Sequence, residues 1–249
     1  MASDKITLHM LPRAYTCPNP SPYPIKLETF LRITGLEYEV DFNKAIGPKG
    51  KTPWITLSGK DYADSQLILE YLSDRFDNDI NAHLSTEDKA LCRVFRVMME
   101  ERYYWCGALD RYQHNAGKHN EHFFPPVKPG IPGFIDKLIK KRVASRFIKN
   151  GKLHGIGRHD METMRNFGKG DIRAVSELLG GNKYFFNGPS PCELDLVVFA
   201  FVTIMLHCTP DDNVYRLLVE EECTNLKEHY LNMKVTYWPD WEECKTEKP

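Results

Sequence analysis

Short apolar runs separated by turn residues dominate the N-terminal part of the chain. Apolar residues flanked by turn residues predict strands over 6–11, 38–42, 53–57 and 61–63, and the turn "SGK" joins the last two into a hairpin. Apolar positions that recur with a helical period predict helices over 21–34 and 65–76. The resulting order is β-α-β, an irregular stretch and then β-β-α, which is the order of a thioredoxin-like domain.

Local residue chemistry supports the ends of these two helices. Ser21 is a typical N-cap residue, Pro22 suits the first helical position, and Gly35 stands where the helix should stop. Asp64 and Ser65 precede the second apolar repeat, where a side-chain oxygen can accept hydrogen bonds from free backbone N–H groups. Both helices therefore have a predicted start.

The pattern changes after residue 77, where helical periodicity replaces short strands. A capping-box-like start at Ser85 begins a helix that runs to about residue 114, and the proline-rich segment 123–134 predicts a loop. Further helices are predicted over 135–149, 160–179, 191–206 and 213–233. We therefore expect an α/β thioredoxin-like domain (1–77) and an all-α C-terminal domain (85–249).

One helix start is ambiguous in the sequence. The segment "SPCEL" offers either Ser190 or Cys192 as the N-cap residue of the helix that follows. A thiol accepts hydrogen bonds poorly, so the sequence favours Ser190. Either choice concerns folding and has no catalytic consequence.

Composition and charge limit the classes of function. The chain has 249 residues, 42% of them hydrophobic and 27% charged, as in ordinary soluble domains. A formal net charge of −1 gives no reason to expect a nucleic-acid partner. The longest apolar run, 194–206, is too short for a membrane span and carries Asp195. No apolar signal segment is recognisable at the start, so a cytoplasmic protein without a membrane span is expected.

The seven cysteines form no metal-binding or redox motif. They are scattered, without a Cys-x-x-Cys pair or a His-Cys spacing suited to a metal ion. This pattern is typical of free thiols in a reducing compartment. The turn "HGIGRH" (154–159) likewise lacks the helical spacing and the carboxylate that a metal site would need, so a structural turn is expected.

Several longer motifs resemble one protein family. "GKTPWI" and "ADSQLILEYL" resemble the glutathione transferases, which join a thioredoxin-like domain to an all-helical one. The failed axon connections family, a relative of the metaxins and of nematode cadmium-responsive proteins, is similar in the motifs "SPYPIKLETFLRITGL", "HGIGRHD", "KYFFNGPSPCELDLVVFAF", "EEECTNLKEHY" and "YWPDW". The resemblance extends over about 5–242 and implies a glutathione transferase fold.

The resemblance also implies a glutathione site. Thr52-Pro53 would be a cis peptide whose backbone pairs with the bound tripeptide. Ser65 would hold the γ-glutamyl carboxylate at a helix N-terminus, Asp64 would meet the ammonium group, and Lys51 would pair with the glycyl carboxylate. The residues alone also allow an edge-strand proline, a helix cap and a solvated lysine.

The catalytic residue has three candidates. Aligning "SPYPIKLETFL" with the Cys-Pro-aromatic start of thiol-type transferases places Ser21 where the family has a cysteine, beside the glutathione sulfur. Cys17 is the main rival and Tyr15 the weaker one. The alternatives are a plain N-cap for Ser21 and a small apolar core residue for Cys17.

The aromatic segment 102–112 is the candidate cosubstrate pocket. Tyr104, Trp105 and Arg111 would line it, although aromatic residues at helical spacing more often belong to the core. Two functions are then open. One is a glutathione transferase that conjugates glutathione to small electrophiles in detoxification, with a homodimer as one open assembly. The other is a non-enzymatic interaction or scaffold protein that retains the fold.

Overall fold

The N-terminal domain contains one mixed four-stranded sheet. The computed structural model describes residues 5–114 and 130–248, so most of the predicted loop 123–134 lies outside the described residues. The strands are β1 (Ile6–His9), β2 (Tyr38–Asp41), β3 (Trp54–Leu57) and β4 (Lys60–Ala63), in the sheet order β2-β1-β3-β4. β1 pairs parallel with β2 and antiparallel with β3, and β3 and β4 form the hairpin. The predicted thioredoxin-like sheet is confirmed.

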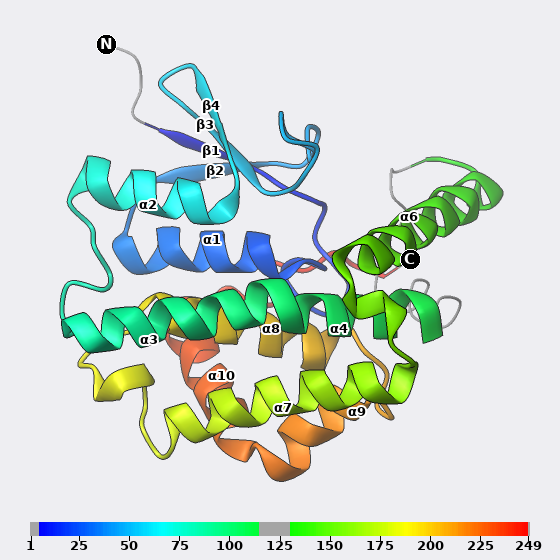
Figure 1. Ribbon diagram of the computed structural model, residues 1–249. Helices are drawn as coiled ribbons and strands as arrows, with labels where there is room; N and C mark the ends of the chain where they lie inside the picture. Colours follow the sequence, from blue (N-terminus) through cyan, green and yellow to red (C-terminus); the bar gives the residue numbers. More distant parts are fainter. Residues whose placement is uncertain (1–4, 115–129, 249) are drawn as a thin grey trace.

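Helix α1 (Pro22–Thr34) lies between this sheet and the helical domain (Figure 1). Ser21 precedes it with extended backbone, and Gly35 ends it in the left-handed conformation, as the sequence predicts. Both flanks of the helix are covered, so Ile25, Leu27 and Phe30 are completely buried. The helix therefore joins the cores of the two domains. Helix α2 (Ser65–Phe76) packs beside it.

One long helical segment opens the C-terminal domain. Ser85 caps α3 (Thr86–Val97) by accepting a hydrogen bond from the Asp88 N–H at 3.1 Å, as predicted. The helix then continues through a π-helical stretch, an α-helical stretch and a second π-helical stretch: η1 (Met98–Tyr103), α4 (Tyr104–Leu109) and η2 (Asp110–His114). Such π segments inside helices often occur at functional sites.

The rest of the described chain is helical and contains no strand, as predicted. Its elements are α6 (Gly133–His154), η3 (Ile156–Arg158), α7 (Met161–Leu179), η4 (Phe185–Asn187), α8 (Glu193–His207), α9 (Val214–Leu217), η5 (Leu218–Glu222) and α10 (Thr224–Tyr237). Helix α8 runs through the centre of this domain and is almost wholly buried. No helix in the described ranges is long and apolar enough to cross a membrane.

Two sequence expectations about helix ends are wrong. The helix predicted over 213–233 is broken at Cys223, and this break leaves the acidic run 220–222 just ahead of α10, where negative charge is favourable. The N-cap of α8 is Cys192 rather than Ser190. The carboxylate of Asp195 accepts the Cys192 N–H at 2.8 Å. This hydrogen bond stabilises the start of α8 although the thiol of Cys192 is a poor hydrogen-bond acceptor.

Candidate functional site

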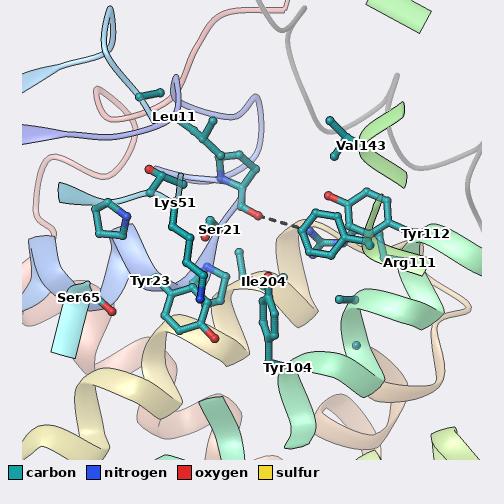
Figure 2. Close-up of a pocket in the computed structure, with 18 of the residues that line it drawn as sticks. Leu11, Ser21, Tyr23, Lys51, Ser65, Tyr104, Arg111, Tyr112, Val143 and Ile204 are labelled. Carbon is teal, nitrogen blue, oxygen red and sulfur yellow. Dashed lines mark hydrogen bonds between the residues drawn. The ribbon is translucent and has the colours of Figure 1, made fainter. Parts of the chain in front are cut away.

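A cleft of about 1930 Å³ lies between the two domains. Its walls are the start of α1, the loop between β2 and β3 and the start of α2 on one side, and η1, α4, η2, α6 and the end of α8 on the other (Figure 2). The cleft brings together nine of the residues that the sequence singles out: Ser21, Lys51, Thr52, Pro53, Asp64, Ser65, Tyr104, Trp105 and Arg111.

The start of α2 forms one end of the polar half of the cleft. Asp64 is the N-cap: its Oδ1 accepts the N–H groups of Gln66 at 3.1 Å and Leu67 at 3.4 Å. Asp64 adopts a φ of 91°, a conformation that costs energy in any residue other than glycine. Ser65 is the first helical residue, and its hydroxyl makes no hydrogen bond within the described parts of the chain. The capping role therefore belongs to Asp64, and Ser65 is left uncommitted.

The loop between β2 and β3 forms the next part of the polar wall. The Thr52–Pro53 peptide is cis, which confirms the expectation from the sequence. The indole N–H of Trp54 donates to the Lys44 carbonyl at 2.8 Å, and a side chain at Gly47 would collide with the Trp54 ring. These contacts hold the loop against β3, and the loop places Lys51 at the cleft.

Ser21 occupies the N-cap position of α1 without capping it. Its hydroxyl accepts no N–H from the helix, while its own N–H donates to Asn19 Oδ1 at 3.1 Å. Asn19 is completely buried and also donates to the Leu11 carbonyl at 2.9 Å, which fixes the turn ahead of the helix. The Ser21 hydroxyl is thus uncommitted at the N-terminus of a 13-residue helix, where an anion is favoured.

Cys17 and Tyr15 do not line this cleft. Cys17 is completely buried, its Sγ lies 3.3 Å from Cys208 Sγ, and it donates to the Asn19 carbonyl at 3.1 Å. Burial raises the pKa of the Cys17 thiol well above its usual value, so the group stays protonated. The geometry therefore gives no support to a nucleophilic role for Cys17.

Tyr23 lines the cleft and was missed by the sequence reasoning (Figure 2). Its hydroxyl donates to the backbone carbonyl of Glu100 at 2.9 Å, and burial raises its pKa well above the usual value. The phenol is therefore committed to the helical domain and does not ionise at neutral pH. The available signal was the aromatic residue just after Ser21-Pro22 at the start of a helix.

Aromatic side chains line the apolar half of the cleft. Tyr112 stacks on Phe147 with ring centroids 4.4 Å apart, and Trp105 packs edge-on against Tyr104 at 5.4 Å. Arg111 Nη1 donates to the Pro20 carbonyl at 3.3 Å, so a residue of the helical domain is hydrogen-bonded to the turn before α1 (Figure 2). The aromatic segment thus lines a cavity, which the sequence left open against a core position.

A buried cluster of charges joins the domains behind the polar half. Lys26 Nζ lies 2.7 Å from Glu100 Oε1 and donates to Gln66 Oε1 at 2.5 Å. Arg96 pairs with the other oxygen of Glu100 at 2.9 Å and with Glu193 at 2.7 Å. Because Gln66 follows Ser65, this cluster fixes the start of α2 against the helical domain. Among the described residues, no group of three His, Cys, Asp or Glu side chains could hold a metal ion.

Comparisons with known sequences match both domains in order. Residues 22–117 match the glutathione S-transferase N-terminal domain, and residues 168–233 match the glutathione S-transferase C-terminal domain. The chain is 34% identical over 258 residues to Failed axon connections of Drosophila melanogaster, an alignment that covers 98% of this chain and 60% of that protein. The chain thus spans less than two thirds of that relative. It is also 30% identical over 210 residues to isoprene-epoxide–glutathione S-transferase of Rhodococcus sp. strain AD45, covering 78% of this chain and 84% of that enzyme.

Solved structures show the same fold. The β-etherase LigF of Sphingobium sp. strain SYK-6 superposes with a TM-score of 0.64 at 17% identity, covering 94% of this chain and 95% of that one. A glutathione S-transferase of Methylobacterium radiotolerans, in complex with glutathione sulfonate, gives 0.62 at 14% identity, with 98% and 96% covered. With both domains matched in sequence and in fold, the chain belongs to the glutathione transferase superfamily, as a member of its failed axon connections family.

Proposed function

We propose that the chain binds glutathione in the polar half of the cleft and conjugates its thiol to small electrophiles bound in the apolar half. The observation that carries this proposal is that two serine hydroxyls, on Ser21 and Ser65, stand uncommitted at the N-termini of two helices that open on one cleft. Each start offers a hydroxyl together with the positive end of a helix dipole, which suits an anionic ligand.

The proposed binding mode follows from where each group lies. Ser65 donates to the γ-glutamyl carboxylate at the start of α2, and the second carboxylate oxygen of Asp64, which caps no N–H, faces the ammonium group. The backbone at Thr52 pairs with the cysteinyl residue by strand addition. Lys51, which is exposed on its loop, neutralises the glycyl carboxylate. The tripeptide therefore lies along the polar wall with its sulfur toward α1.

Ser21 is proposed to act on the reacting sulfur. A free thiol has a pKa of about 8.5, and lowering it by one unit stabilises the thiolate by about 1.4 kcal/mol. The Ser21 hydroxyl donates to the thiolate after its proton has left to solvent. The sulfur then attacks the electrophilic carbon, and the leaving group or opened epoxide oxygen takes the electron pair. The isoprene-epoxide relative supports small epoxides as one electrophile class.

Glutathione binding is tested by calorimetry on the wild type and on Ser65→Ala. We expect Ser65→Ala to lose about 1.5–3 kcal/mol of affinity, the range for a hydrogen bond to a charged group. Ser73→Ala is the matched control, because it makes the same change on α2 outside the lining of the cleft. Equal affinity in the wild type and the Ser65 variant would show that this serine holds no ligand.

The chemical step is tested separately with Ser21→Ala and a chloronitrobenzene-type or epoxide electrophile. Since the Ser21 hydroxyl makes no capping bond, its removal should leave the melting temperature unchanged, so lost turnover cannot be blamed on folding. We expect kcat/KM to fall while glutathione affinity stays nearly intact, and the pKa in the pH–rate profile to rise. An unchanged profile would exclude Ser21 as the sulfur partner.

A second function is favoured by the relationship to Failed axon connections. That similarity spans nearly the whole chain, so an interaction or scaffold role that retains the fold is the competing proposal. Glutathione binding without turnover on any electrophile would favour the scaffold.

We propose a homodimer in either case, since Leu67 on α2 and Val94 on α3 expose more than half of their surface. Analytical ultracentrifugation tests the dimer.

We also propose a cytoplasmic detoxification setting for the enzyme. All seven cysteines are free and buried, which suits a reducing compartment. Fractionation of cells that express the chain tests the location. Recovery of the protein in an oxidising secretory compartment would contradict it.

A further inference from the structure

Helix α6 carries a charge that the rest of the chain does not share. Among its 22 residues are seven lysines and arginines and a single acidic residue, Asp136. The helix therefore has a surplus of six positive charges in a chain whose formal net charge is −1, so the remainder of the chain is negative by seven. In Figure 1, α6 projects from the edge of the molecule opposite α2 and α3.

Most of these cations have no ion-pair partner among the described residues. Lys140 pairs with Asp136 at 2.8 Å. Five others are exposed and form no ion pair with any described residue: Lys141, Arg142, Arg146, Lys149 and Lys152. At about 100° per residue they fall within an arc of about 140° around the helix. They therefore make one continuous basic face, which we call the outer face of α6.

The outer face also exposes large apolar side chains. Phe134, Leu138 and Leu153 are 74%, 66% and 69% exposed and lie within the same arc as the five cations. The opposite side of the helix packs on the protein through Ala144 and Gly151, where a larger residue would meet Leu109. The helix is thus anchored on one side and presents mixed basic and apolar residues on the other.

We propose that the outer face of α6 docks on a bilayer surface that contains anionic phospholipids. Lysine and arginine are attracted to anionic headgroups, and exposed phenylalanine and leucine enter the boundary between headgroups and acyl chains. A nucleic acid would meet the cations but leave the three apolar side chains in water. The strongly negative remainder of the chain would also repel a polyanion that reaches beyond α6.

Most of this docking surface is separate from the proposed glutathione site. Arg146 and Leu153 lie at the margin of the outer face and also line the cleft, together with Ile139 and Val143 on the adjoining side of the helix. The other six residues of the outer face do not line the cleft. Peripheral docking through one helix needs no membrane-spanning segment, which agrees with the described helices.

The test is co-sedimentation of the full chain with vesicles of phosphatidylcholine alone or of phosphatidylcholine with phosphatidylserine. We expect binding to the anionic vesicles only, weakening as salt screens the charges. The triple variant Arg142→Gln/Lys149→Gln/Lys152→Gln should bind at least about tenfold more weakly, since each basic residue near an anionic surface contributes about fivefold. The matched control Lys49→Gln/Lys60→Gln/Arg93→Gln removes the same charge from exposed positions elsewhere and should bind as the wild type does.

The variant Phe134→Ser/Leu138→Ser separates a bilayer from other polyanions. It keeps every charge, so its expected several-fold loss of vesicle binding reports insertion of the apolar side chains. Circular dichroism and glutathione calorimetry should be unchanged in all variants, because the substituted residues are exposed and none of them lines the cleft. Absence of vesicle binding at low salt overturns the proposal. Equal binding to duplex DNA, with no effect of the Phe134/Leu138 change, also overturns it.

Discussion

Replacing Lys26 by methionine tests how strongly the buried charge cluster ties the two domains together. The Lys26 side chain is only 2% exposed, and its ammonium group contacts Glu100 of the helical domain and Gln66 of α2. Methionine has a similar length and fills the space without a charge. The change therefore removes one partner of a buried ion pair and leaves the other in place.

The expected loss in the free energy of unfolding depends on the ion pair that Glu100 retains. Removing one partner of a buried pair typically costs about 3–5 kcal/mol, because the remaining charge is uncompensated. Glu100 retains Arg96 at 2.9 Å on its other oxygen, so we expect a loss near the lower limit, about 3 kcal/mol. Arg96 in turn keeps Glu193, so the double variant Lys26→Met/Glu100→Gln leaves no carboxylate of this cluster without a cation. It should recover about 1–2 kcal/mol of the sum of the single losses.

Urea unfolding measures these free energies, and glutathione calorimetry measures the effect on the cleft. Because Gln66 adjoins Ser65, the loss of Lys26 should also weaken glutathione binding. The control is Lys89→Met, which removes an exposed pair with Asp79 at 3.6 Å and should cost less than about 1 kcal/mol. A loss below about 1 kcal/mol for Lys26→Met, or strict additivity in the double variant, would refute the reasoning.

Three further predictions concern stability and thiol chemistry. Burial raises the pKa of Asp171 to about 6, so the folded state binds the proton more tightly and stability falls as pH rises through about 4 to 6. After allowance for solvent screening, Asp171→Asn should therefore gain about 1–2 kcal/mol relative to the wild type between pH 4 and pH 7, measured by urea unfolding at each pH. An added Cβ at Gly168 would lie 2.7 Å from Tyr215, so Gly168→Ala should lose about 1–3 kcal/mol by thermal melting, whereas Gly170→Ala, with open space, should not destabilise. Cys17 should resist alkylation in the native state, and Cys17→Ala should keep its turnover; rapid native labelling that abolishes activity would contradict this.

Much of the fold could be predicted because its signals are local. The strand and hairpin pattern, the glycine at the end of α1 and the Ser85 and Asp160 caps each act within a few residues. The helix predicted over 160–179 matches α7 at both ends because an N-cap and a glycine bound a strong periodic pattern. Local chemistry and tertiary packing agree at these positions.

The errors occur where a distant residue decides the local structure. Asp195 makes the start of α8, and it is held in place by His229 at 2.8 Å, a residue from α10. No property of the segment around Ser190 reports that partner. Cys17 is similar, because it is completely buried beside Cys208, which is 191 positions away in the sequence. Sequence spacing alone cannot distinguish such a buried thiol from a reactive one.

The candidate site was predicted in composition but not in its hydrogen bonding. Sequence reasoning gave Ser21 a cap role or a catalytic role, and weighed capping against ligand binding for the pair Asp64 and Ser65. The structure assigns the cap of α2 to Asp64 and fixes the turn before α1 through Asn19. Which backbone N–H group a side-chain oxygen accepts depends on differences of a few degrees in the backbone angles, and no sequence pattern specifies these angles.

These details bear on whether the cleft binds a ligand or is only a structural feature of the fold. A serine that caps its helix typically contributes about 1 kcal/mol, and Ser21 stands at the N-cap position without forming that bond, since Pro24 at the third helical position has no N–H to donate. Asp64 accepts a positive φ that typically costs about 1–3 kcal/mol. The absent cap bond at Ser21 and the positive φ of Asp64 both lie on the wall of the same cleft. A chain selected only for a folded scaffold has no reason to keep them together, whereas a chain that presents hydroxyls to a ligand does. Local stability given up at one place is therefore the strongest physical reason to test ligand binding first.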